Sequence, residues 1–203
     1  LGTAAALGSL GFAGAAHADA VFGIPGSADK LALNPGNVGH ILYAPYYSAQ
    51  GTSSTLFSIV NTDESAGKAV KVRFRAAANS DDVLDFIVYL SPGDVWNAEL
   101  ASTGDFGYLK TSDTSCTDPL KEEWDDLGNG RYGVGLRNLR LDQNLSLADQ
   151  AINANEGYLE VLNMADIRPD TALYDAIKHV KNADGDMVAP CTATVLEALR
   201  STE

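Results

Sequence analysis

The chain of 203 residues can bury one sizeable core, and its hydrophobic content of 45% is ordinary for a globular protein. Its net charge is -13, from 14 Lys and Arg against 27 Asp and Glu. Nucleic acids and anionic membrane surfaces bind clustered basic side chains, so this balance argues against both as partners. We expect an acidic, soluble, exported protein.

The first 18 residues have the composition of a secretory signal peptide that lacks its start. They contain no Asp, Glu, Lys or Arg, and they end in Ala16-His17-Ala18, a small-x-small pattern for signal peptidase. The alternative is an Ala- and Gly-rich helix that the mature protein keeps, although its glycines weaken it. We expect secretion to the extracellular space or cell surface, with the periplasm as an alternative. No later stretch is apolar for long enough to cross a bilayer.

Residues 19–40 are rich in Gly, Pro and Asn and show little periodicity, which predicts an extended N-terminal arm. Its apolar patch consists of Val21, Phe22 and Ile24. These residues could pack on their own domain, or they could be donated to a neighbouring subunit as an added strand. The arm is therefore the expected intersubunit element.

Alternating apolar and polar side chains predict a row of strands after the arm. The expected strands are 41–47, 55–61, 69–75, 83–91 and one that starts at Trp96. Pro45 cannot donate to a ladder, so it places the first strand at an edge or a bulge. Polar turn sequences separate the strands, which favours hairpins.

The register of the hairpin between 69–75 and 83–91 follows from placing Arg75 opposite Val83. This choice sets every apolar pair on one face: Phe74 with Leu84, Val72 with Phe86, and Val70 with Val88. It also sets Arg73 opposite Asp85, a cross-strand charge pair worth up to about 1 kcal/mol. The outer row of Lys71, Arg73 and Arg75 could bind an acidic polymer, but this pairing favours a charge-paired surface.

The preceding turn predicts a second hairpin, with 55–61 paired to 69–75. Its neighbours would be Val60 with Val70 and Leu56 with Phe74. Both hairpins then share one buried face, and a one-residue slip would turn that face to water. We expect a three-stranded meander at the centre of an antiparallel sheet.

Beyond residue 100 the periodicity weakens, and residues 101–156 are expected to form a loop-rich insertion. Within it, residues 120–127 are compatible with a helix, Tyr132, Val134 and Leu136 alternate again, and 142–155 is a loop or a short helix. Residues 157–164 predict a further strand. Two short helices follow, one over 170–180 that an Asp can cap, and one over 194–200 that Thr192 or Thr194 can cap.

Short strands with turn signals and no long intervening helices predict a mainly β protein. We expect an antiparallel, immunoglobulin-like β-sandwich over 41–203, with the insertion and two short C-terminal helices. The run NTDESAGKAVKVRFRAAANSDDVLDFIVYLSPGDVW, with GYLEVLNMADI and the APC that ends at Cys191, resembles a group of exported bacterial surface proteins of uncertain function. The resemblance implies a compartment rather than a chemistry.

Cys116 and Cys191 are the two cysteines of the chain. In an oxidising compartment such a pair predicts a disulfide. It would close a loop of about 75 residues and stabilise the fold by about 4 to 5 kcal/mol in the chain-entropy model. A zinc site is the alternative, but neither His40 nor His179 lies at ligand spacing from a cysteine.

No catalytic or cofactor motif occurs in the sequence. Gly-x-Ser-x-Gly, HExxH, CxxC, a Walker loop and a dinucleotide fingerprint are all missing. His40 and His179 could serve acid–base chemistry, but we expect both to be structural or exposed. We therefore expect no enzyme, with no catalytic residue, no cofactor and no metal ligand set.

Carboxylates are the abundant reactive groups, and a glycosidase needs two of them facing one cleft. The adjacent pairs Asp81-Asp82, Glu122-Glu123 and Asp125-Asp126 are expected to be solvated surface charge. Calcium uses oxygen-rich loops such as Asp184-Gly185-Asp186 after Asn182, and Asp125-Asp126 before Asn129, but neither follows the EF-hand pattern. Bound calcium stays an alternative.

Tyr43, Tyr46 and Tyr47 have the aromatic side chains that bind sugars and proteins, although packing in the core or at an edge is the favoured interpretation. The leading hypothesis is a non-enzymatic cell-surface or matrix protein. It would serve adhesion or self-assembly, including as a filament subunit, and its partners would be other copies or other surface proteins. The alternatives are a carbohydrate-binding module, calcium-assisted or not, that uses these tyrosines, and a carboxylate-based secreted hydrolase.

Overall fold

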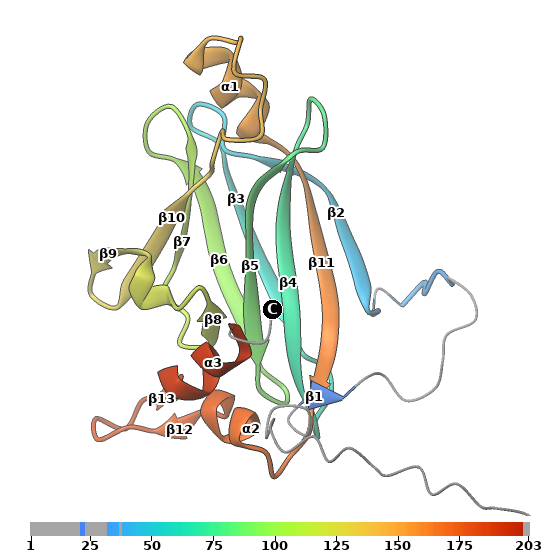
Figure 1. Ribbon diagram of the computed structural model, residues 1–203, viewed down its shortest axis with the longest axis vertical. Helices are drawn as coiled ribbons and strands as arrows, with labels where there is room; N and C mark the ends of the chain where they lie inside the picture. Colours follow the sequence, from blue (N-terminus) through green and yellow to red (C-terminus); the bar gives the residue numbers. More distant parts are fainter. Residues whose placement is uncertain (1–20, 23–31, 37, 201–203) are drawn as a thin grey trace, which may run out of the picture.

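In the computed structural model, which describes residues 21–22, 32–36 and 38–200, two antiparallel sheets pack face to face (Figure 1). The protein is thus mainly β and sandwich-like, as the sequence predicts. Residues 1–18, Ile24 and most of the arm lie outside the described residues. The helices are short, and none of those described is long and apolar enough to cross a membrane.

The first sheet, sheet A, has six strands and is five strands wide. One edge is formed by β1 (Val21–Phe22) and β2 (Ile41–Ser48), and the order continues with β11 (Glu156–Ile167), β4 (Gly67–Ala76), β5 (Asp82–Leu90) and β8 (Cys116–Asp118). β1 and β2 follow one another along the same edge of β11, because β4 pairs with its other edge from end to end. The strand predicted at 157–164 is therefore a central strand.

The second sheet, sheet B, has five strands in the order β3 (Ser54–Val60), β6 (Val95–Ser102), β7 (Gly107–Thr111), β10 (Arg131–Gly135) and β9 (Asp125–Gly128). Three of these strands lie within residues 101–156. The expectation of a loop-rich stretch there is corrected, because β7, β10 and β9 complete a sheet. Buried Leu109 on β7 packs in the core.

Helices lie at the two ends of the sandwich (Figure 1). α1 (Leu147–Ala154) covers one end, and α2 (Ala172–Ile177) and α3 (Ala193–Arg200) lie at the other, beside the hairpin of β12 (Val180–Lys181) and β13 (Met187–Val188). A 3-10 turn, η1 (Lys121–Glu123), precedes β9. Both predicted C-terminal helices are confirmed, but Thr171, not Asp170, caps α2 by accepting a hydrogen bond from the Tyr174 N–H.

The register of the β4–β5 hairpin is confirmed for all three apolar pairs and for Arg73 opposite Asp85. Arg75, however, lies opposite Asp82 and not Val83, because a bulge follows Phe74. The ion pairs also differ from the expectation: Asp85 contacts Lys71, one step along the same face, while Arg73 reaches Asp82. Long cationic side chains lean along the strand, so the opposite residue is not always the charge partner.

The second predicted hairpin is wrong. β3 does not pair with β4; it pairs with β6 in sheet B, over a continuous register from Ser54 opposite Ala101 to Val60 opposite Val95. Its alternation is also inverted, since Ile59 is buried while Leu56 and Val60 are 76% and 53% exposed. The three-stranded meander is therefore reduced to the β4–β5 pair.

A chain of aromatic rings joins the two sheets through the core. The successive ring centroids are 5.3 Å apart for Tyr47 and Phe74, 5.6 Å for Phe74 and Phe57, 5.7 Å for Phe57 and Trp96, 5.4 Å for Trp96 and Phe86, and 5.3 Å for Phe86 and Trp124. All five are tilted or edge-to-face contacts, each worth about 0.5 to 1.5 kcal/mol beyond area burial. The chain of rings passes from Tyr47 and Phe74 of sheet A to Phe57 and Trp96 of sheet B, and returns to Phe86 of sheet A. It therefore fixes how the sheets face one another.

Gly157 permits the closest approach in sheet A. A Cβ atom added there would lie 1.8 Å from the carbonyl oxygen of Arg75 and 3.0 Å from the Tyr47 ring. The β2–β11 register also shifts just after this residue. Any side chain at 157 would push β11 away from β4, so the position requires glycine.

A second, smaller core covers part of the outer face of sheet A. It consists of Ala69, Tyr89, Cys116, Ala165, Ile167, Leu173, Ile177 and Leu196, so it joins the sheet to α2 and α3. The predicted disulfide is present, with the Cα atoms of Cys116 and Cys191 separated by 5.3 Å. It fastens the segment before α3 to the edge strand β8. The loop that it closes stabilises this cap by about 4 to 5 kcal/mol in the chain-entropy model.

Asp63 organises the turn between β3 and β4. Its Oδ1 accepts hydrogen bonds from the Ser65 N–H and hydroxyl and from the Ala66 N–H, and its Oδ2 lies 2.9 Å from Lys68 Nζ. Lys68 also contacts Asp166 on β11, 2.8 Å away. The Lys68 ammonium first, and then the Ser65 N–H, hold the pKa of Asp63 well below its usual range.

We predict that Asp63→Asn lowers the free energy of unfolding by about 1 kcal/mol at neutral pH, as for the loss of a capping carboxylate. The folded-state pKa lies below the unfolded value, so this stabilisation is complete above about pH 4 and is lost as the pH falls towards the folded pKa. Urea unfolding of both proteins should therefore show a difference near neutral pH that shrinks at about pH 3. A difference that stays constant with pH would contradict this assignment.

Candidate functional site

One edge strand of the sandwich is unprotected, and it defines the candidate site. Proteins shield sheet edges with prolines, charges, bulges or very short strands. β2 has Pro45 and a bulge, β9 has two aspartates and a bulge, and β1 and β8 are two and three residues long. β3, with the sequence STLFSIV, is seven residues long and has none of these devices.

The hydrogen bonds of β3 show which backbone groups face the open side. The Asn61 N–H donates to the Asp94 carbonyl, which continues the β3–β6 register by one residue. Hydrogen-bonded pairs alternate along an antiparallel ladder, so odd-numbered residues of β3 bond to β6. The N–H and C=O groups of Leu56, Ser58 and Val60 therefore point away from the sheet, and the described part of the chain provides no strand to pair with them.

The open part of this edge has defined limits. At one end the Thr55 hydroxyl donates to the Ser48 carbonyl and accepts from the Ser48 N–H, which ties β3 to the end of β2. At the other end Asn61 is buried, and its side chain donates to the Ala66 and Ser91 carbonyls. The stretch available to a new strand is thus 56–60, which we call the open edge.

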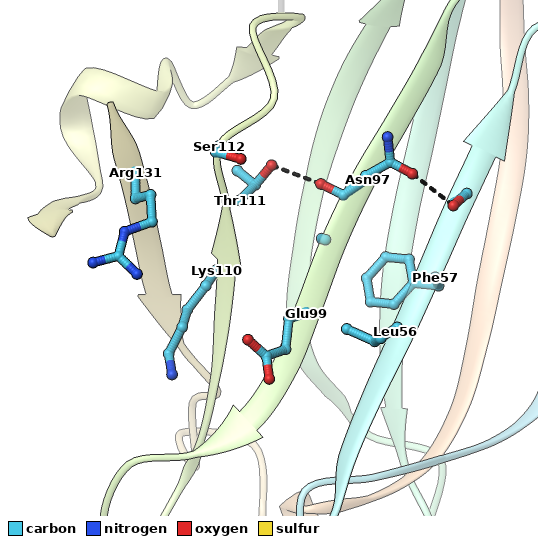
Figure 2. Close-up of a pocket in the computed structure, with 10 residues that line it drawn as sticks. Leu56, Phe57, Asn97, Glu99, Lys110, Thr111, Ser112 and Arg131 are labelled. Atoms are coloured by element: carbon cyan, nitrogen blue, oxygen red, sulfur yellow. Dashed lines mark hydrogen bonds between the residues drawn. The ribbon is translucent and has the colours of Figure 1, made fainter. Parts of the chain in front are cut away.

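A shallow depression of about 530 Å³ lies beside the open edge on the outer face of sheet B (Figure 2). Leu56 borders it on β3, and Glu99, Lys110 and Arg131 contribute side chains from β6, β7 and β10. Asn97 forms part of its floor, where its side chain accepts from the Ser58 hydroxyl and its carbonyl accepts from Thr111. The depression is mixed in character, with two cations, one carboxylate and one apolar border.

The cations of the two outer faces differ in their partners. On sheet A, Arg75 lies 3.0 Å from Glu160 and Arg73 lies 3.4 Å from Asp82, so the predicted charge-paired surface is confirmed. On sheet B, neither Lys110 nor Arg131 forms an ion pair with any residue that the structure describes. These two side chains are therefore available to an anionic group.

Tyr108, further along the same face of sheet B, is held in place by contacts within the protein and is not free to bind a ligand. Its ring lies against Gly133, where an added Cβ would come within 2.2 Å of it, and its hydroxyl donates to Asp125. Burial, followed by the hydrogen bond to the Asp125 carboxylate, raises the pKa of Tyr108 to about 12. The Tyr108 ring therefore has a fixed position on the outer face of sheet B.

The three tyrosines singled out in the sequence do not form one surface. Tyr47 is 2% exposed, and its hydroxyl donates to the Ala154 carbonyl in the core. Burial raises the pKa of this hydroxyl. Tyr43 and Tyr46 are 62% and 61% exposed, and the Tyr46 hydroxyl donates to Glu156. Only these two remain on the surface of the edge strand β2.

His179 connects the C-terminal cap to the sandwich. Its Nδ1 lies 3.1 Å from the Ser91 hydroxyl and 3.4 Å from Asp94 Oδ2, and its Nε2 lies 3.0 Å from the Thr114 hydroxyl. Ser91 and Asp94 belong to the turn between β5 and β6, and the Asp94 carboxylate also accepts from the Ser91 N–H. The arrangement satisfies both ring nitrogens within a structural junction, whereas His40 is exposed.

The carboxylates and oxygen-rich loops are also placed by the structure. Asp82 contacts Arg73 and Arg140, and Asn182 closes the turn of the β12–β13 hairpin by accepting from the N–H groups of Asp184 and Asp186. Among the described residues, no group of three or more His, Cys, Asp or Glu side chains is arranged to hold a metal ion.

The comparisons with known proteins add no relative. No family model, no curated protein and no solved structure matches the chain. The class that the structure itself defines is a mainly β protein with two packed antiparallel sheets.

The prediction missed the open edge because it made residues 55–61 the first strand of a meander at the centre of the sheet. The signal was present: STLFSIV contains no charge, proline or glycine, which protected edges have. The arm residues Val21 and Phe22 form β1, which pairs with Asp166 and Ile167 of the same chain.

Proposed function

We propose that this protein is an exported, non-enzymatic surface or matrix protein that self-assembles by adding a strand to the open edge of β3. The single observation that carries the proposal is an uncharged seven-residue edge strand that no described segment covers. An edge of this kind is a template for pairing with another chain. The immunoglobulin-like character of the fold and the location outside the cytoplasm belong to the same proposal.

The charge of the molecule makes the location of this edge informative. At a net charge of -13, copies of the chain repel one another over most orientations. The open edge brings no charge of its own to a contact, and it exposes Leu56 and Val60. Val60 lies opposite Val95 on the adjacent strand. Backbone hydrogen bonds and apolar contact can therefore act where charge repulsion is weakest.

The arm supplies a second contact in this proposal. β1 consists of two residues paired to β11, and residues 23–40 separate it from β2 in the sequence. A short strand on a long connection can be exchanged between identical copies at low cost, because each copy regains the same pairing. Such an exchange would join molecules through sheet A, independently of β3.

We predict that Ser58→Pro abolishes or strongly weakens self-association. The Ser58 N–H points to the open side, so proline removes a donor needed by an added strand without removing a β3–β6 hydrogen bond. Light scattering and sedimentation of the purified protein would measure the change in mass.

Ser58→Ala is the matched control, because it removes the same hydroxyl bond to Asn97 but keeps the N–H. It should assemble like the original protein. Circular dichroism would verify that the proline variant keeps its sheet content. Unchanged assembly by a folded Ser58→Pro variant would refute the role of this edge.

A second prediction concerns the arm. Deletion of residues 19–24 should leave the contact at β3 intact but prevent growth into longer assemblies, because the exchanged strand is lost. Negative-stain images and light scattering of the truncated protein should show small, uniform particles. Long assemblies that persist after the deletion would remove the arm from the proposal.

Carbohydrate binding is the second candidate function, and the depression on sheet B is the observation that favours it. Lys110 and Arg131 without ion-pair partners, together with the polar floor at Asn97, suit a glycan that bears carboxylates. The tyrosine site has less support, since Tyr47 is buried. A hydrolase has still less support, because Asp82 contacts Arg73 and Asp125 accepts a hydrogen bond from Tyr108.

We predict, for this second candidate, that an acidic glycan retained on an array loses binding on combined Lys110→Ala and Arg131→Ala substitution. Lys181→Ala, on the distant β12–β13 hairpin, should leave binding unchanged. Repeating the array with a chelator tests the calcium-assisted version. The absence of binding to every glycan, with and without the chelator, would eliminate carbohydrate binding.

A further inference from the structure

The open edge of β3 is complementary to a second copy of itself. We infer that two molecules pair β3 with β3 in antiparallel orientation about a twofold axis, with Ser58 opposite Ser58 of the second copy. The inference rests on the proposed self-assembly and adds its partner, symmetry and register. It would join the two B sheets into one continuous sheet of about ten strands.

The register follows from the limits of the open edge. Only residues 56–60 are free, because the Ser48–Thr55 hydrogen bonds close one end and buried Asn61 closes the other. An antiparallel partner that uses the whole stretch must pair 56 with 60, 57 with 59, and 58 with itself. A shift by two residues in either direction would leave part of the stretch unpaired or run into a closed end.

The backbone directions agree with this register. Leu56, Ser58 and Val60 all direct N–H and C=O groups outward. In the proposed register each of these residues lies opposite another of the three, so both members of every such pair can form backbone hydrogen bonds. Three hydrogen-bonded pairs, each exchanging two bonds, give about six backbone hydrogen bonds across the axis. A register shifted by one residue would set bonding groups against residues already bonded to β6.

The side chains agree as well. On the outer face, Leu56 of each copy meets Val60 of the other, which gives two apolar cross-strand pairs related by the axis. Phe57 and Ile59, which face the core, would lie opposite one another. Glu99, the carboxylate opposite Leu56, lies on β6 and thus one strand back from the axis. No like charges meet, despite the acidity of both molecules.

A second copy suits the open edge better than the arm does. The arm strand β1 already pairs with β11, and it is two residues long, against five open residues on β3. The strand itself matches that length, is uncharged and provides apolar side chains at the required positions.

Cysteine crosslinking tests the register directly. The natural cysteines are joined to one another, so an engineered cysteine is the single free thiol. Paired residues that exchange hydrogen bonds have Cα atoms about 5.5 Å apart, a distance that a disulfide spans. Ser58→Cys should therefore form a covalent dimer on mild oxidation, which a non-reducing gel and mass spectrometry would detect.

Single variants at the flanking positions provide the control. The two copies of Leu56 would lie four residues apart along the strands, roughly 13 Å, which is too far for a disulfide. Leu56→Cys alone should therefore give roughly tenfold less covalent dimer than Ser58→Cys. A mixture of Leu56→Cys and Val60→Cys molecules should recover the crosslink as a heterodimer.

The outcomes separate this inference from the function on which it rests. Crosslinking by Ser58→Cys and by the mixed pair, but not by Leu56→Cys alone, supports the twofold register. Assembly that is sensitive to Ser58→Pro, without a Ser58→Cys crosslink or with preferential Leu56→Cys crosslinking, overturns the register and leaves self-assembly at β3 standing. A folded protein that stays monomeric at every concentration overturns both.

Discussion

The contact of Trp96 with Phe57 and Phe86 is the interaction on which the rest of the structure depends. Trp96 is fully buried on β6, and its ring lies between a ring of its own sheet and a ring of the opposite sheet. Its indole N–H has no hydrogen-bond partner in the described structure, which costs about 1 to 3 kcal/mol. The surrounding aromatic contacts and the buried area more than offset this penalty.

This contact also determines the surface of β3. Because Phe57 must reach Trp96 and Phe74, the odd-numbered residues of β3 face the core, and the even-numbered ones face solvent. In the same strand the odd-numbered residues bond to β6, so the even-numbered residues also have free backbone groups. The same alternation along β3 thus decides which side chains pack in the core and which backbone groups are free at the edge.

Local pattern was sufficient for β4 and β5, where a tight loop keeps the partners adjacent and only one register buries all apolar pairs. It failed for β3, because both of its faces are apolar enough to be the inner one: Leu56 and Val60 compete with Phe57 and Ile59. The choice is made by Trp96, which lies 39 residues after Phe57 and belongs to the second sheet. The sheet that β3 joins, and the face that it buries, could not be predicted without that long-range contact, whereas the disulfide needed only the count of cysteines.

Gly157 has a consequence for finding proteins that share this fold. Its backbone lies so close to Arg75 that no other residue fits, and the requirement comes from geometry rather than from any function. A chain with this fold could change nearly all its surface residues and many core residues and would still require glycine at this position. A glycine that opens a long alternating strand, paired with a strand of basic outer residues, would therefore mark a distant relative where overall similarity has faded.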